Sequence, residues 1–159
     1  MLTALLTAAA RPATLHLTST AFEDGARIPR VHSCEGADLS PPLAWSEGPR
    51  GTAAYALVVD DPDAPRATFV HWLAWNIYST FLTVGQQGGM LQGRNDFGRD
   101  AYGGPCPPTG HGDHRYRFNV YALDTALALQ AGATQKQLDH TMAGHVLARG
   151  TLTGRYRRD

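Results

Sequence analysis

Two carboxylates alternate with two prolines directly after an apolar segment. The stretch Asp60-Asp-Pro-Asp-Ala-Pro65 places Asp61 and Asp63 around Pro62. Proline fixes its own φ and disfavours helical backbone at the residue before it, so we expect a stiff, extended segment. In extended backbone the two carboxylates project to the same side, where they repel each other unless a cation, a donor or a ligand lies between them. The alternative is a solvated acidic turn, because Asp and Pro are ordinary turn residues.

Two histidines and a tyrosine supply hydrogen-bond donors, whereas the carboxylates of Asp61 and Asp63 are acceptors. His71 begins the next apolar segment, and His114 and Tyr116 follow a loop rich in Pro and Gly. Their i, i+2 spacing places His114 and Tyr116 on one face of a strand, whereas His111 is expected to be exposed. A carboxylate beside an imidazole favours the imidazolium, which donates hydrogen bonds. Imidazolium and phenol groups bind phosphate oxygens, and carboxylates accept an ammonium or hydroxyl group, so the set indicates a site for a phosphate-bearing or zwitterionic group.

A second hypothesis assigns the same side chains to a metal. A metal-dependent hydrolase could use nitrogen and oxygen ligands from Asp61, Asp63, His71 and His114, with Tyr116 as a proton donor. The spacing matches no recognised metal-ligand motif, and a protonated imidazole cannot coordinate a metal. We therefore expect no metal, no cofactor and no catalytic residue, and keep the hydrolase as the alternative.

The two cysteines leave two questions open. Cys34 and Cys106 adjoin Gly- or Pro-containing stretches and form no C-x-x-C unit. Two small buried thiols are the simpler interpretation, and a mutual disulfide stays open. A third hypothesis makes Cys106 a hydrolytic nucleophile, although it lies between prolines and the chain has no G-x-S-x-G motif.

Three apolar segments must position these side chains. Residues 53–60 and 71–77 are rich in β-branched and aromatic residues and are flanked by Pro or Gly. Residues 114–123 alternate between apolar and polar positions, which predicts a strand with one face in the core. Many short strands with abundant Gly (17) and Pro (10) predict a mainly β protein, an antiparallel β-sandwich of two sheets with minor helices.

One segment is predicted to be helical. Thr134 and Gln137 form a capping box, and Leu138, Met142 and Val146 recur every four residues. The pattern predicts a helix that ends at 149–150, where a cation precedes a Gly, followed by a closing strand over 152–156.

Composition limits the class of protein. The 159 residues carry 14 Lys+Arg and 14 Asp+Glu, and this balance argues against a nucleic-acid partner. With no composition break, residues 1–159 are predicted to form a single domain. No apolar run is long enough to span a membrane, and residues 2–10 have no basic residue before their apolar part, unlike a signal peptide. A cytoplasmic protein is therefore expected, with a periplasmic or secreted one left open.

Six segments, in order along the chain, carry a resemblance. They are Cys34-Glu-Gly-Ala-Asp-Leu-Ser-Pro-Pro-Leu-Ala-Trp45, Asp61-Pro-Asp-Ala-Pro65, His71-Trp72, Gly93-Arg-Asn-Asp-Phe-Gly98, Tyr102-Gly-Gly-Pro-Cys-Pro-Pro108 and His114-Arg-Tyr116. Within a match over about residues 15–156, they resemble the phosphatidylethanolamine-binding protein family, which includes Raf kinase inhibitor protein, and particularly its bacterial branch.

The resemblance implies a β-sandwich with a small anion pocket at one end. By position, the family's pocket residues fall on Asp61, Asp63, His71, Pro108, His114 and Tyr116, with Pro108 forming a wall. The implied function is non-enzymatic binding of a phosphate-bearing ligand: a phospholipid head group, a nucleotide or a phosphorylated residue. It also implies a kinase or phosphoprotein partner, as for a Raf kinase inhibitor-like protein, and a homodimer.

Overall fold

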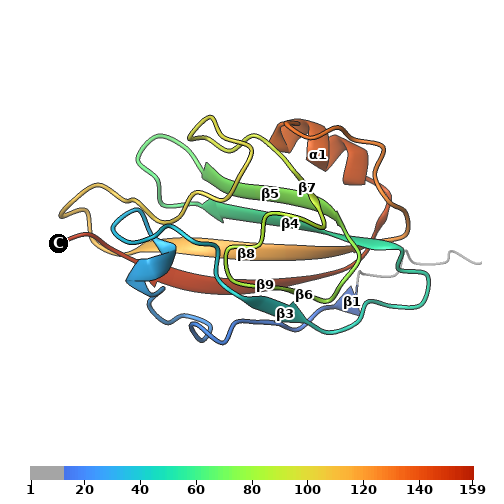
Figure 1. The fold of residues 1–159 in the computed structure, drawn as a ribbon, viewed down its shortest axis with the longest axis horizontal. Coiled ribbons are helices and arrows are strands. Elements are labelled where there is room, and N and C mark those ends of the chain that lie inside the picture. Colours follow the sequence, from blue (N-terminus) through green and yellow to red (C-terminus); the bar gives the residue numbers. More distant parts are fainter. Residues whose placement is uncertain (1–12) are drawn as a thin grey trace, which may run out of the picture.

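The computed structural model describes residues 13–159, which form two stacked β-sheets and one short α-helix (Figure 1). The expectations for residues 2–10 lie outside this range. The larger sheet has the order β1-β9-β8-β4-β5-β7, and the smaller has the order β2-β3-β6. The two-sheet architecture predicted from the sequence is therefore confirmed.

The strands of the larger sheet differ greatly in length. They are β1 (Ala13–Thr14), β4 (Ala54–Asp61), β5 (Phe69–Ile77), β7 (Leu91–Gln92), β8 (His114–Leu123) and β9 (Val146–Tyr156). The smaller sheet contains β2 (Leu17–Thr18), β3 (Leu43–Trp45) and β6 (Phe81–Leu82), and a short 3-10 helix, η1, covers Arg30–His32. All pairs are antiparallel except β1 with β9, which run parallel.

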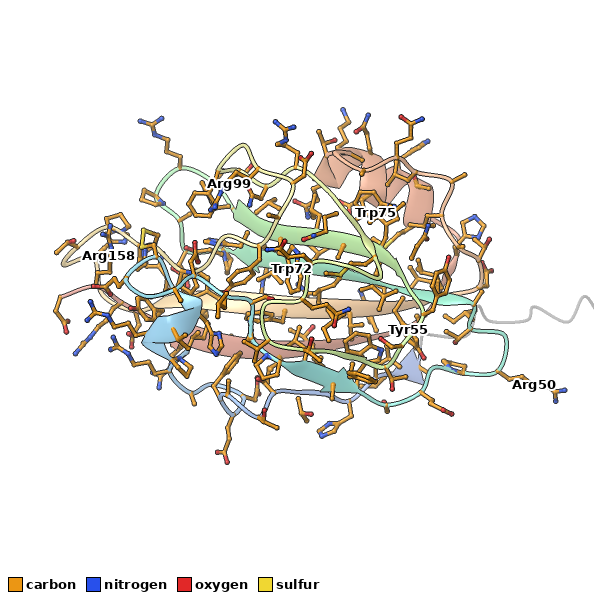
Figure 2. All side chains as sticks on the ribbon, viewed as in Figure 1. Arg50, Tyr55, Trp72, Trp75, Arg99 and Arg158 are labelled. Atoms are coloured by element: carbon orange, nitrogen blue, oxygen red, sulfur yellow. A yellow bond between two sulfur atoms is a disulfide. The ribbon has the colours of Figure 1, made fainter. Side chains whose placement is uncertain are left out.

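The larger sheet has a hydrophobic core on each face. One core, between the two sheets, contains Trp72, Tyr116 and Phe118, and the other contains Trp75 and Leu138 of the helix α1 (Gln135–Met142). Figure 2 shows Trp75 close to α1 and Trp72 in the middle of the molecule. Because both faces are covered, all eight residues of β4 are buried, as its nearly continuous apolar sequence predicts.

The predicted strand over 114–123 is confirmed together with its alternation. His114, Tyr116, Phe118 and Val120 are buried, whereas the residues between them are exposed or half-buried. The side chains that could carry chemistry therefore share a strand face with the core.

The prediction for the helix is wrong at its end. The capping box of Thr134 and Gln137 is present, but α1 ends at Met142. Gly144, with φ +82°, turns the chain, and Val146 already belongs to β9, where its ladder with β8 replaces helical hydrogen bonds. No helix within residues 13–159 is long and apolar enough to cross a lipid bilayer.

The topology brings the predicted site residues to one end of the larger sheet. Strand β4 runs antiparallel to both β5 and β8, so the end of β4 lies beside the beginnings of its two neighbours. Asp61 ends β4, Phe69 begins β5 and His114 begins β8. This is the end of the sheet that carries the C-terminus in Figure 1.

Candidate functional site

A cavity of about 220 Å³ opens at this end of the sheet. Its lining comes from three strands, β4, β5 and β8, and from the two loops β4–β5 and β7–β8: Asp61, Ala64, Pro65, Phe69, His71, Phe97, Cys106, Pro107, Pro108, His114 and Tyr116. Pockets that take drug-sized ligands measure about 300–1,000 Å³, so this cavity suits a small group. Five of the six residues expected at the site line it, and Asp63 does not.

Asp61 and His114 form a buried hydrogen-bonded pair. Oδ2 of Asp61 lies 2.7 Å from Nδ1 of His114, and their side chains are 5% and 2% exposed. A carboxylate can only accept, so Nδ1 of His114 carries the proton and donates it. Oδ1 of Asp61 accepts the backbone N–H of Asp63 at 2.7 Å. Both carboxylate oxygens are therefore satisfied within the protein.

His71 is placed by a β-bulge and held by the backbone. In the β4–β5 ladder Val59 pairs with Trp72 and Asp60 with Val70, which leaves His71 as the extra residue. Its Nδ1 donates to the carbonyl of Gly103 at 2.7 Å, which leaves Nε2 with a free lone pair in the neutral ring. The partner of His71 is a carbonyl rather than a carboxylate, and burial lowers the pKa of His71, outweighing the nearby carbonyls and carboxylates, so the neutral ring is favoured.

Tyr116 brings a hydroxyl without a partner to the cavity. The residue is 1% exposed, and its Oη has no hydrogen-bond partner among residues 13–159. Burial, with a smaller contribution from the charge of Asp61, raises the pKa of Tyr116 far above its ordinary value. The phenol therefore stays neutral and can donate a hydrogen bond. Its ring meets His71 edge-on, with the ring centres 5.1 Å apart.

Asp63 has a different role from the one its spacing indicates. The segment after Asp61 is a turn rather than extended backbone, closed by the bond from Asp63 N–H to Asp61. The carboxylate of Asp63 turns away and accepts three hydrogen bonds from Arg115, at 2.8 to 3.0 Å. Hydrogen bonding to Arg115 lowers the pKa of Asp63 to about 2. The expected pair of facing carboxylates is therefore wrong, and Asp63 anchors the turn to β8.

A disulfide holds the wall of the cavity that Pro107 and Pro108 form, here called the proline wall. Cys34 and Cys106 are bonded, with their Cα atoms 5.4 Å apart, and residues 13–159 contain no free cysteine. The neighbouring backbone is joined as well, because Cys34 N–H donates to the carbonyl of Pro105 and Gly104 N–H donates to Asp38. The interpretation as two thiols is wrong, and so is the hypothesis of a nucleophilic thiol at Cys106.

Aromatic side chains that sequence reasoning missed form the other wall. Phe69 and Phe97 pack edge-on, with ring centres 4.8 Å apart, and both contact the ring of His71. Phe97 is 40% exposed at the cavity, and the guanidinium of Arg99 lies 5.5 Å from the centre of its ring. Phe97 belongs to the segment 93–98, which is part of the resemblance to the family. This membership was the one indication in the sequence that Phe97 could lie at the site.

Arg158, near the C-terminus, reaches the proline wall. Its Nε donates to the carbonyl of Pro107 at 2.6 Å, and the side chain is half-buried. The guanidinium is close enough to oppose the rise in the pKa of Tyr116. Figure 2 shows Arg158 at the same end of the molecule as this wall. It supplies positive charge beside the cavity.

The four residues expected as metal ligands are not grouped closely enough to bind one metal ion together. Within the described chain, no three His, Cys, Asp or Glu side chains are grouped so that they could hold a metal ion. Asp63 is bound to Arg115, and the other three residues do not form a site together. The arrangement contradicts the metal-site geometry on which the hydrolase hypothesis depends.

Comparison with known proteins decides the family. A family model described as phosphatidylethanolamine-binding protein matches residues 18–157. The chain belongs to this family. The resemblance drawn from the six segments is therefore confirmed.

Similar proteins within the phosphatidylethanolamine-binding protein family come from bacteria and archaea, among them the following three. A UPF0098 protein from Aquifex aeolicus is 44% identical over 92% of this chain and 91% of its own length. A UPF0098 protein from Pyrococcus horikoshii is 48% identical over 88% of this chain and 75% of its own. The suspected lipoprotein LppC of Mycobacterium tuberculosis is 44% identical over 93% of this chain and 74% of its own.

Solved structures show that the fold is the one this family adopts. A phosphatidylethanolamine-binding protein homologue from Chlamydia trachomatis has a TM-score of 0.87 and 40% identity, and covers 92% of this chain and 99% of its own. YbcL from Escherichia coli, described as a member of the mammalian family, has a TM-score of 0.85 and 33% identity, covering 92% of this chain and all of its own.

In this member of the phosphatidylethanolamine-binding protein family, the cavity combines three polar side chains with apolar walls. Tyr116 can donate, the neutral ring of His71 can accept, and His114 is held by Asp61 at the same end. Such a combination can surround a small polar group.

Proposed function

We propose that this cavity binds a phosphate-bearing ligand reversibly, without making or breaking a covalent bond. The observation that carries the proposal is Tyr116, which lines the cavity and whose buried hydroxyl makes no hydrogen bond within residues 13–159. A buried polar group without a partner costs about 1–3 kcal/mol. A ligand oxygen in the cavity removes this cost, so the empty protein is prepared for an acceptor-rich group.

The surroundings of the cavity favour an anionic acceptor. The guanidinium of Arg158 lies beside the proline wall, and His71 can take up a proton at Nε2 when a negative oxygen approaches. Asp61 is the carboxylate that lines the cavity, and both its oxygens already accept N–H groups, which reduces its repulsion of an anion. The family's name, which refers to a phospholipid, supports the same class of ligand.

The lining supports binding rather than catalysis. The residues around the cavity include no Ser, Thr or Lys, and the sulfur of Cys106 is part of a disulfide. A covalent mechanism that uses a hydroxyl or thiol nucleophile of Ser, Thr or Cys beside a general base therefore has no nucleophile in this lining. Control of a kinase, expected from the resemblance, stays a prediction.

The test is calorimetric titration with inorganic phosphate and with O-phosphoethanolamine. We expect saturable binding of both to the wild-type protein. Tyr116→Phe keeps the packing but removes the donor, and because a hydrogen bond to a charged group is worth about 1.5–3 kcal/mol, it should weaken binding roughly 10- to 150-fold. Tyr121→Phe is the matched control, because Tyr121 lies on the opposite face of the same strand. No binding of either compound by the wild type contradicts the proposal.

A second measurement tests the absence of chemistry. Phosphorus NMR of O-phosphoethanolamine, incubated with the protein, should show the unchanged compound. Release of inorganic phosphate at a rate that falls in Tyr116→Phe would show catalysis and contradict the non-enzymatic part of the proposal.

We further propose that the protein functions in an oxidising compartment. The bond between Cys34 and Cys106 supports this, because disulfides persist outside the reducing cytosol and are rare within it. This is the periplasmic or secreted alternative that the sequence left open. Alkylation of the protein in intact cells, before lysis, should find no reactive thiol. Full labelling of both cysteines would favour the cytoplasm.

A further inference from the structure

The ring nitrogen of His114 that an anion would need is already occupied. Nδ1 of His114 donates to Asp61, so the neutral ring offers a ligand only the lone pair of Nε2, which can accept from an O–H group such as that of a monoprotonated phosphate. Nε2 lies 2.6 Å from Nδ1 of His111, and the two rings meet edge-on with their centres 4.8 Å apart. A ring nitrogen has a single in-plane direction for a hydrogen bond, so a ligand oxygen and His111 cannot both use it.

The loop that carries His111 has the features of a movable segment. His111 is exposed, and it lies between Gly110 and Gly112, which have φ values of +76° and +85°. A Cβ added at either glycine would have no heavy atom within 4 Å, so the loop is not packed against other residues at these two positions. The loop is tied by backbone hydrogen bonds from Gly110 N–H to Arg158 and from His111 N–H to Pro108. The imidazole can therefore leave His114 while these two anchors stay in place.

We propose that His111, which contacts the pocket residue His114 from outside the lining, is a competitor for the ligand: its imidazole donates to Nε2 of His114 in the empty protein, the O–H group of a phosphate-bearing ligand displaces it, and the displacement sets the affinity. This rests on the proposed function. His111 is a positioning residue in the empty state, because it fixes the ring of His114 from the side opposite Asp61. The Asp61–His114–His111 chain keeps a buried imidazole satisfied at both nitrogens until the ligand arrives, which avoids an unpaired buried group.

The competition has a direction that can be measured. Removing His111 frees Nε2 of His114, so the ligand no longer has to replace a hydrogen bond worth about 0.5–1.5 kcal/mol. His111→Ala should therefore bind inorganic phosphate roughly 2- to 12-fold more tightly than the wild type. His111→Asn places an amide near the position of Nδ1 and should return the affinity to that of the wild type. His140→Ala, an exposed histidine on α1, is the control and should change nothing.

Nitrogen NMR of the labelled wild-type protein gives an independent readout. The coupling across the hydrogen bond between His111 Nδ1 and His114 Nε2 should be present without ligand and lost on addition of phosphate. Retention of this coupling in the phosphate complex overturns the inference, because it shows that the ligand does not use this nitrogen.

The outcomes separate this inference from the proposed function. If the wild type binds phosphate and His111→Ala binds equally or more weakly, the competitor role is wrong and the proposed function stands; weaker binding would make His111 a ligand contact. If only His111→Ala binds phosphate, the competitor role holds, but the proposed function of the wild-type protein is contradicted. If neither protein binds phosphate, the proposed function is overturned and the inference falls with it.

Discussion

Oδ2 of Asp61 and Nδ1 of His114 are joined by a 2.7 Å hydrogen bond across 53 residues of sequence. The bond links the end of β4 to the beginning of β8, and both side chains are almost completely buried. In this setting the carboxylate determines which nitrogen of His114 carries a proton and which way the ring faces. The geometry of the cavity therefore depends on one contact between two neighbouring strands.

Asp61→Asn should destabilise the protein by about 1–2 kcal/mol, because a neutral hydrogen bond replaces a charge-assisted one that is roughly twice as strong. Urea denaturation measures the change. Asp63→Asn, two residues further on, is the matched control and should change the free energy of unfolding much less, because its partner Arg115 is solvent-exposed. If the two variants lost the same free energy of unfolding, the buried pair of Asp61 and His114 would contribute no more to stability than the exposed pair of Asp63 and Arg115.

Anion binding should strengthen as the pH falls, because of His71. In the empty pocket burial lowers the pKa of His71 below its ordinary 6.5, and an anion near Nε2 raises it again. Binding therefore takes up a proton, and affinity rises as the pH falls, by at most about tenfold per pH unit, until the pH reaches the lowered pKa of the empty state. Sulfate is the suitable probe because it does not itself titrate between about pH 5 and 8, where histidine does.

The control for this pH dependence is His71→Gln, which keeps a polar group but cannot titrate. Asp61, His114 and Tyr116 still face the cavity in this variant, so any slope that remains belongs to them. Calorimetry in two buffers with different ionisation enthalpies counts the protons directly. A wild-type affinity for sulfate that does not change with pH contradicts the role given to His71.

The local sequence pattern was sufficient to predict the strands that carry the site. The alternation from His114 to Leu123 specifies one buried face, and the antiparallel neighbours of β4 then bring Asp61, His71 and His114 to one end. The same kind of pattern failed at Val146. Its four-residue spacing from Met142 is helical, but Gly144 turns the chain and pairing with β8 takes over.

Contacts between distant segments could not be derived from spacing alone. The turn after Asp61 exists because a carboxylate accepts a nearby N–H group, and this sends Asp63 to Arg115 instead of into the cavity. The contact between His111 and His114 depends on how a glycine-flanked loop folds back on its own strand. Side-chain hydrogen bonds of this kind compete with regular backbone, and residue type does not show which of them wins.

Loss of the disulfide should weaken both the fold and the pocket. Cys34 and Cys106 are 72 residues apart, so their bond restricts the unfolded chain strongly, and typical disulfides contribute about 2–4 kcal/mol. Denaturation with and without a thiol reductant should show a loss of this size. The double variant Cys34→Ser/Cys106→Ser should match the reduced protein and be insensitive to reductant. Because Cys106 lines the cavity, both forms should also bind phosphate more weakly. Unchanged stability on complete reduction would contradict this account.

Gly104→Ala tests whether the close packing behind the proline wall shapes the cavity. A Cβ at Gly104 would lie 2.1 Å from the carbonyl oxygen of His32 and 2.5 Å from Oδ1 of Asp38, so the backbone must shift. The shift breaks the hydrogen bond from Gly104 N–H to Asp38 and should cost about 1–3 kcal/mol of stability.

The same shift moves the segment that leads into the cavity wall at Cys106, so phosphate binding should weaken together with stability in Gly104→Ala. Calorimetry well below the unfolding temperature separates the two effects, because the folded fraction can be held constant. Gly88→Ala is the control, since a Cβ there meets no atom within 4 Å and Gly88 does not adopt a positive φ. If Gly104→Ala lost stability but kept wild-type phosphate affinity, the wall would hold its shape without this packing, and the disulfide to Cys34 would be the element that maintains it.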